Sequence, residues 1–207
     1  MRVADLRGWG GNAAATKYAS EIKRVASAEA SSVPGSTAVA EEVARGLHKL
    51  MAYKDEYEVA RLQVEGLRTM PKGARVKVLL HPPLLRAMGL KNKLKFGAWF
   101  FPLLAMLARF KFLRGTPFDV FGYAHIRRVE RQLPAEYLGL VNRSLAKLTP
   151  DTLEIVVEIA ALPDIVRGYE QIKLANLERF RASAQQLSAE LDASEQPLHA
   201  LLEDISA

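Results

Sequence analysis

The chain has 207 residues, with 29 Lys and Arg against 23 Asp and Glu, and no cysteine. This length suits a single domain over residues 1–207, and the absence of cysteine excludes a disulfide or a cysteine-ligated iron–sulfur cluster held by this chain. No run is long and apolar enough for a membrane span and no signal-peptide pattern opens the chain, so we expect a cytoplasmic protein without a membrane partner.

The N-terminal third of the chain predicts two helical segments. Residues 1–33 are expected to form an N-terminal helical arm, which ends at the Val-Pro-Gly-Ser turn of residues 33–36. A long polar helix is predicted over residues 34–67. Ser36 or Thr37 is expected to be its N-cap, because a hydroxyl there can accept a hydrogen bond from a free N–H of the first turn.

Residues 68–118 are predicted to form a basic segment with an apolar helix. Residues 75–80 alternate in polarity between turn residues, which predicts at most one short β-strand or hairpin near residues 75–81. A lone strand needs a partner, and a neighbouring domain is one possible source of it. Residues 97–112 are then expected to form the apolar helix.

Residues 119–207 are predicted to form the C-terminal helices, which completes an all-α or mostly α chain, an irregular multi-helix bundle. The first of these helices covers residues 123–148, where Pro134 is expected either to kink it or to split it. A short helix follows over residues 151–161, and Pro163 opens the last long helix.

The stretch from Ala44 to Leu62, ARGLHKLMAYKDEYEVARL, is unusually rich in charge and tyrosine for a packing helix. Carboxylates and cations recur three or four residues apart, where they can meet on one helical face. Two interpretations remain open: an ordinary solvated surface, or a largely buried hydrogen-bonded network in the core or at an interface. The candidate members of that network or interface are Tyr53, Lys54, Glu56, Tyr57 and Arg61.

Charge is concentrated in residues 66–118, which contain eleven Lys and Arg and no Asp or Glu. A charge run is usually a solvated face, but these cations have no carboxylate partner within their own segment. Either acids elsewhere in the fold or an acidic or phosphorylated partner must pair with them. The expected contributors to a face that docks an anionic partner are Lys91, Lys93, Lys95, Arg109, Lys111 and Arg114.

No catalytic, cofactor-binding or metal-ligating residue can be nominated. No glycine-rich phosphate loop follows a predicted strand, the four histidines form no metal-spaced pair, and no nucleophile-elbow pattern occurs. Asp119 stands between Phe118 and Phe121. The favoured interpretation is that Asp119 caps the next helix while the aromatics pack in the core, and the alternative is a ligand pocket.

Five stretches in chain order carry a family resemblance that covers nearly all of the chain. It resembles the C-terminal accessory region of the indolepyruvate ferredoxin oxidoreductases, although residues 63–74 are shorter than the corresponding family loop. The stretches are VPGSTAVAEEVARGLHKLMAYKDEYEVARL from Val33, HPPLL from His81, FGAW from Phe96, LRGTPFDVFGY from Leu113 and LTPDTLEIVVEIAALPDIVRGYEQIK from Leu148.

The resemblance implies a parent enzyme that oxidatively decarboxylates aryl pyruvates to acyl-CoA and passes the electrons to ferredoxin. Thiamine pyrophosphate, iron–sulfur clusters and CoA are implied for that parent only, since this chain lacks both cysteine and the Gly-Asp-Gly thiamine motif. We therefore expect a non-catalytic accessory domain that contributes subunit assembly or a docking face. Its expected partners are the catalytic domain or subunit of the parent, with ferredoxin as a further candidate.

An independent helical module is the alternative from another functional class. It would bind an anionic partner, either nucleic acid or a membrane surface, through residues 66–118 in a salt-sensitive manner. Nucleic acid is disfavoured because the basic stretch around Lys93 is accompanied by few aromatics and by no recognised nucleic-acid fold.

Overall fold

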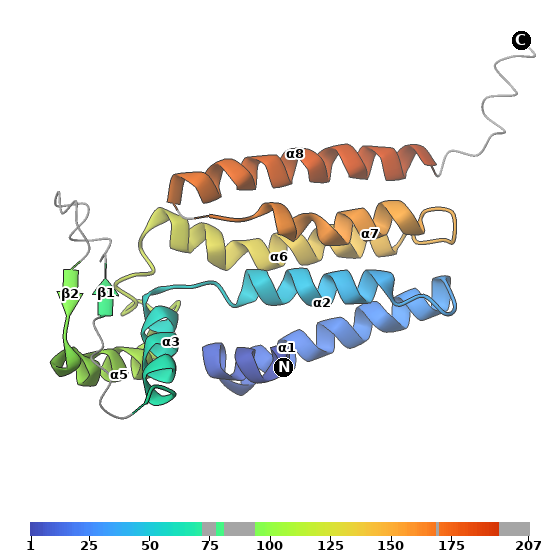
Figure 1. Ribbon diagram of the computed structural model, residues 1–207. Coiled ribbons are helices and arrows are strands. Elements are labelled where there is room, and N and C mark those ends of the chain that lie inside the picture. The colour runs from blue at the N-terminus through green and yellow to red at the C-terminus, as the bar shows by residue number, and fades with distance from the viewer. Residues whose placement is uncertain (72–77, 81–93, 169, 195–207) are drawn as a thin grey trace, which may run out of the picture. The chain divides into compact units, whose positions relative to one another are not determined.

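The computed structural model describes residues 1–71, 78–80, 94–168 and 170–194, and it confirms a mostly helical chain with one short hairpin (Figure 1). The sequence predicts one domain, whereas the chain divides into two compact units. We call residues 1–53 with 124–207 the bundle unit and residues 54–123 the insert unit.

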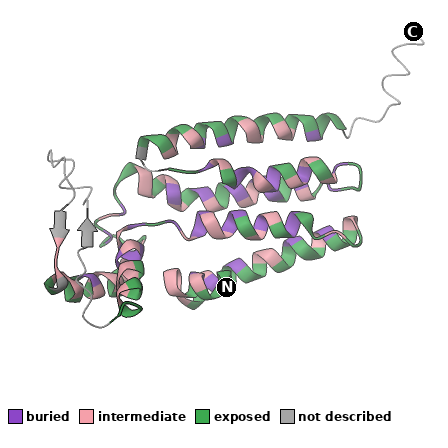
Figure 2. Cartoon of the chain, viewed as in Figure 1, coloured by how far each residue is buried: buried purple, intermediate pink, exposed green. Residues whose placement is uncertain are grey.

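The bundle unit consists of helices packed against one another, with α6 and α7 between α2 and α8 (Figure 1). Within it α2 contacts α1, α6 and α7, while α8 packs on α6 and α7. The purple residues of Figure 2 mark where these helices bury their apolar faces. The elements are α1 (Arg2–Ser32), α2 (Ala38–Met51), α6 (His125–Leu145), α7 (Leu153–Ala161), the short 3₁₀ helix η3 (Leu162–Ile165) and α8 (Glu170–Ser194).

Apolar side chains at helical spacing build the bundle core. Val39, Val43 and Leu47 are fully buried along one face of α2, as expected for positions three or four residues apart. Two buried tyrosines add hydrogen bonds across this core: Tyr18 donates to the carbonyl of Ala44 at 2.8 Å, and the Tyr137 hydroxyl donates to the carbonyl of Ala160 at 2.6 Å.

The turn between α1 and α2 is held mainly by Glu29, and of the two predicted hydroxyls only that of Ser36 accepts from a first-turn N–H among the bonds described, that of Ala38 at 3.4 Å. Thr37 is the N-cap residue of α2, but its side chain makes no capping bond. The fully buried Glu29 carboxylate instead accepts hydrogen bonds from the N–H of Val39 at 2.9 Å and of Ala40 at 2.8 Å, and from the Ser36 hydroxyl at 2.6 Å. A helix N-terminus favours such an anion, because its free N–H groups carry partial positive charge.

The predicted helix over residues 34–67 is two helices, so that prediction was wrong. α2 ends at Met51, and α3 (Glu56–Arg68) begins after the N-cap Asp55, whose carboxylate accepts from the N–H of Glu58 at 2.8 Å. The pattern of an acid followed three residues later by Glu is typical of a helix start, and it overrides the continuous helical periodicity.

The insert unit packs α3 against α5 (Phe101–Arg109). Ala60 of α3 and Leu104 of α5 are its buried apolar centre. β1 (Val78–Leu80) lies within the predicted strand and pairs antiparallel with β2 (Leu94–Phe96), so its partner comes from the same unit. The short 3₁₀ helices η1 (Ala98–Phe100) and η2 (Phe110–Leu113) flank α5.

The C-terminal helices differ from prediction mainly at the two prolines, Pro134 and Pro163. α6 continues across Pro134, and Pro163 lies in η3, so the last helix α8 begins later, at Glu170. Gly168 stands before α8 with φ of 93°, a conformation that glycine adopts without steric cost. None of the helices in the described part of the chain is long and apolar enough to cross a membrane.

Candidate functional site

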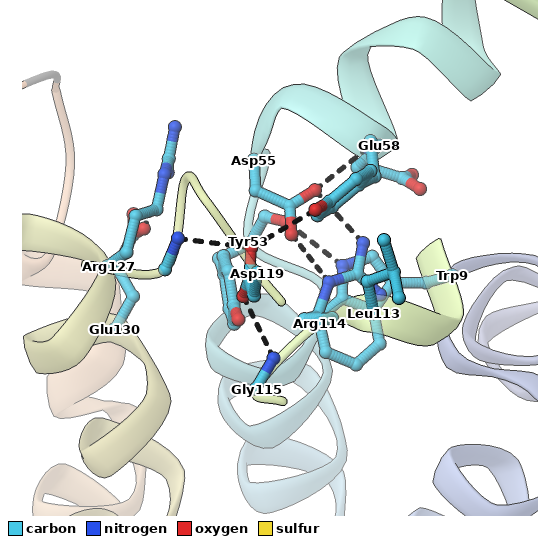
Figure 3. Close-up of polar contacts among 12 residues, drawn as sticks. Trp9, Tyr53, Asp55, Glu58, Leu113, Arg114, Gly115, Asp119, Arg127 and Glu130 are labelled. Atoms are coloured by element: carbon cyan, nitrogen blue, oxygen red, sulfur yellow. Dashed lines mark hydrogen bonds and ion pairs between the residues drawn. The ribbon is translucent and has the colours of Figure 1, made fainter. Parts of the chain in front are cut away.

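The insert unit contains a buried ion pair between the start of α3 and the residue after η2. The Arg114 guanidinium donates through Nε to Asp55 Oδ2 and through Nη2 to Asp55 Oδ1, the latter at 2.9 Å (Figure 3). The Arg114 side chain is 9% exposed and that of Asp55 is 4% exposed. Such a paired geometry is the strong form of an Arg–carboxylate contact. Asp55 thus has two roles, because its Oδ1 also caps α3.

Asp119 is the second buried carboxylate of the insert unit, and it organises its own loop. Its Oδ2 accepts from the N–H of Gly115 at 2.8 Å, and its Oδ1 accepts from the N–H of Gly122 at 3.0 Å (Figure 3). The Tyr57 hydroxyl also donates to Oδ1, at 3.2 Å. Asp119 therefore closes the loop over residues 115–122 and ties it to α3.

This geometry corrects the expectation for the Asp119 segment. Asp119 does not cap the next helix, because the N-cap residue of α6 is Ala124. Phe118 is 75% exposed and so does not pack in the core. Phe121 does pack, with its ring edge-on to Tyr57 at a centroid distance of 5.3 Å.

Tyr57 contacts both Asp119, through its hydroxyl, and Arg114, through its ring. Its ring lies under the Arg114 guanidinium, 5.8 Å from centroid to Cζ. Burial, then the negative charge of Asp119, raises the pKa of Tyr57 to about 12. The hydroxyl consequently keeps its proton at neutral pH and stays a hydrogen-bond donor to Asp119.

A second ion pair lies one turn further along α3. Arg61 donates to both oxygens of Glu58, through Nε at 2.8 Å and Nη2 at 2.6 Å, and to Glu65 at 2.9 Å. Glu58 is buried and Arg61 is largely buried. We use the term buried polar network for Asp55, Tyr57, Glu58, Arg61, Arg114 and Asp119.

Residues 1–186 match DUF6537, described as a family of unknown function. The chain belongs to the DUF6537 family. No curated protein and no solved structure matches it significantly. The DUF6537 match covers the insert unit, the bundle unit as far as residue 186, and every residue of the buried polar network.

Two of the five residues predicted for a polar network belong to it in this DUF6537 chain: Tyr57 and Arg61. Tyr53 is buried in the bundle unit, where its carbonyl accepts from the Trp9 indole at 3.0 Å. Lys54 is exposed and Glu56 is half-buried in the first turn of α3. The prediction missed Asp55, Glu58 and Asp119 as members, although the helix-start spacing of the first two was visible in the sequence.

The predicted docking cations of this DUF6537 chain fall into three groups. Arg114 was wrongly predicted to contribute to the docking face, because its side chain is largely buried and pairs with Asp55. Lys91 and Lys93 lie outside the described residues, and Lys95 is in β2, where only the backbone is described. Arg109 is exposed at the end of α5, and Lys111 is half-buried in η2.

The chemistry of the buried polar network is that of a structural site. Its carboxylates accept hydrogen bonds from backbone N–H groups, guanidinium groups and a tyrosine hydroxyl. Throughout the described residues of this DUF6537 chain, no three His, Cys, Asp or Glu side chains are grouped to hold a metal ion. The arrangement stabilises a loop against a helix start.

Proposed function

We propose that the chain is a non-catalytic accessory part of an indolepyruvate ferredoxin oxidoreductase-like enzyme, in which it contributes subunit assembly or a docking face. The observation that carries the proposal is that two of the stretches that resemble the indolepyruvate ferredoxin oxidoreductase region contact each other in the structure. YKDEYEVARL supplies Asp55, Tyr57 and Glu58, while LRGTPFDVFGY supplies Arg114 and Asp119. These two stretches form one buried polar network that holds the insert unit together.

The non-catalytic role is supported by how these side chains are used. A catalytic acid, base or nucleophile must reach a substrate, whereas Asp55 and Asp119 are each 3% exposed and are bound by protein donors. This chain also supplies no cysteine to ligate an iron–sulfur cluster. Thiamine pyrophosphate, the clusters and CoA would be held by the catalytic parts of the parent.

Association with those catalytic parts tests the proposal. The purified chain is mixed with the catalytic polypeptides of an indolepyruvate ferredoxin oxidoreductase from the same organism, and binding is measured by calorimetry at increasing salt. We expect a complex that weakens with salt, because exposed charges are screened beyond about 8 Å at physiological ionic strength. Absence of a complex at low salt would overturn the proposal.

A charge-reversal variant tests whether the basic segment takes part. Lys91, Lys93 and Lys95 are changed to Glu together, and both complex formation and ferredoxin-linked turnover are measured in the assembled enzyme. A loosened complex or slowed turnover is expected if these cations meet an acidic surface. If neither quantity changes at low salt, these three lysines form a solvated face. Binding of DNA or anionic vesicles without binding of the catalytic polypeptides would favour the independent module.

A further inference from the structure

α5 of the insert unit has apolar residues on a buried face and on an exposed face. Leu104 is buried against Ala60 of α3, with Leu107 and Ala108 partly buried beside it. Four large apolar residues that are exposed follow each other at spacings of four, three and four: Leu103 and Met106 lie in α5, Trp99 in the preceding η1 and Phe110 in the following η2. We call them the apolar stripe: Trp99 is 72% exposed, Leu103 46%, Met106 47% and Phe110 37%.

Exposed apolar residues that line up along one side indicate a binding surface more strongly than the same residues scattered singly. Single exposed leucines are common on any surface, whereas contiguous exposed apolar patches mark interaction sites. Trp, Met and Phe are also types that are enriched in the cores of protein interfaces. Phe112, in the 3₁₀ helix that follows, is 69% exposed and extends the apolar character of this part of the chain.

The stretch of sequence that contains the stripe is strongly basic, and this limits the kinds of molecule that could bind there. The stripe lies within the 53 residues that contain eleven cations and no carboxylate. Arg109 is exposed in α5, between Met106 and Phe110 in sequence. A second copy of this chain would bring the same basic segment against itself, and like charges at an interface are unfavourable. A free phosphate could pair with the cations but could not cover four apolar side chains.

We propose that the apolar stripe is the centre of a docking surface for a protein partner whose own surface has an apolar centre and a rim of carboxylates. This inference rests on the proposed function and states the chemistry of the surface that the accessory part meets. The stripe supplies apolar contact area, and the exposed Arg109 supplies positive charge that complements a carboxylate rim.

Single substitutions on the stripe test this inference with the full chain. Leu103→Glu and Met106→Glu place a carboxylate on the proposed centre, and Arg109→Glu reverses a charge beside it. The control is Leu62→Glu: Leu62 is 38% exposed on α3, two residues beyond the buried Ala60 and so on another helical face. All four sites are exposed, so the fold should be retained, as circular dichroism melts would check.

Binding to the catalytic polypeptides named above is the readout. We expect Leu103→Glu and Met106→Glu each to raise Kd roughly tenfold or more, a change of about 1.4 kcal/mol or more. Arg109→Glu should raise Kd mainly at low salt, and Leu62→Glu should leave Kd within about twofold of the parent.

Other outcomes would overturn the inference in distinguishable ways. If the parent chain binds and the stripe variants bind equally well, the docking surface lies elsewhere and the proposed function stands. If the variants instead abolish self-association in analytical ultracentrifugation, the occupant is a second copy. If they abolish only binding to phosphatidylcholine–phosphatidylglycerol vesicles, it is a bilayer. If the parent chain binds none of these, the proposed function and the inference both fail.

Discussion

Arg114 and Asp55 show how a buried charge depends on its partner. Removing one member of a buried pair leaves the other charge out of water without compensation, which costs far more than losing an exposed pair. Both side chains here are nearly inaccessible, and Asp55 also caps α3. The pair is therefore expected to be a main determinant of the stability of the insert unit.

Arg114→Met tests that expectation against Arg109→Met, the same change at an exposed arginine. We expect Arg114→Met to lower the free energy of unfolding of the insert unit by about 3 kcal/mol, and Arg109→Met to change it by less than about 0.5 kcal/mol. Urea unfolding followed by Trp99 fluorescence, in a Trp9→Phe background, reports on the insert unit. Equal effects of the two changes would show that the Arg114 pair adds little.

Tyr57 makes the stability of the same unit sensitive to alkaline pH. Folding raises the pKa of Tyr57 from 10.0 to about 12. Because the folded state holds this proton more tightly, the contribution is complete below pH 10 and is lost as the pH rises through 12. We expect the free energy of unfolding to fall over this window, and to fall less steeply in Tyr57→Phe. Identical slopes in the two proteins would contradict this assignment.

At the scale of elements, the N-terminus of α2 is capped mainly by the Glu29 carboxylate of the preceding helix, whereas the local sequence predicts a hydroxyl cap. Glu29→Ala removes the acceptor of three hydrogen bonds at a buried helix start, so a loss of about 2 to 3 kcal/mol is expected. The predicted cap is the control: the Thr37 hydroxyl bonds only the exposed Glu41 side chain among the bonds described for it, and Thr37→Ala should cost less than about 0.5 kcal/mol.

Trp9 fluorescence in a Trp99→Phe background follows unfolding of the bundle unit for this comparison. Similar losses for Glu29→Ala and Thr37→Ala would mean that the hydroxyl and the carboxylate share the capping role. A larger loss of unfolding free energy for Thr37→Ala than for Glu29→Ala would show that the Thr37 hydroxyl is the main cap.

Helix content and the hairpin were predictable because periodicity and turn residues are local properties. The break between α2 and α3 was also local, and the spacing of Asp55 and Glu58 indicated it, but the apolar periodicity continues across the break. Glu29 as a cap and Asp55 as the partner of Arg114 were not predictable. Both contacts form only after the chain has turned back on itself. Glu29 is 10 positions from Val39, and Asp55 is 59 positions from Arg114.

For the whole molecule, the two units differ in how much apolar surface their described residues bury. The bundle unit has an extended core that includes Leu47, Tyr137 and Phe180, whereas the apolar core of the insert unit centres on Ala60 and Leu104. Buried apolar area is the main favourable term in folding. The insert unit is therefore expected to be the less stable of the two and to depend more on its polar network.

Two fluorescence-monitored transitions should separate the units. We expect the Trp99 signal to change at a lower urea concentration than the Trp9 signal, because the described residues of the insert unit bury less apolar surface than those of the bundle unit. The measurement uses Trp9→Phe and Trp99→Phe chains, each with one remaining tryptophan. Coincident transitions would show that the chain unfolds as one cooperative structure.

The separation of Asp55 and Arg114 along the chain also has a kinetic consequence. Their contact closes a loop of 59 positions, and the entropy lost in closing a long loop must be met before the contact forms. We expect such a contact to form late in folding and so to add little to the folding rate. The buried pair is then expected to slow the unfolding of the insert unit, which lengthens the lifetime of the folded chain.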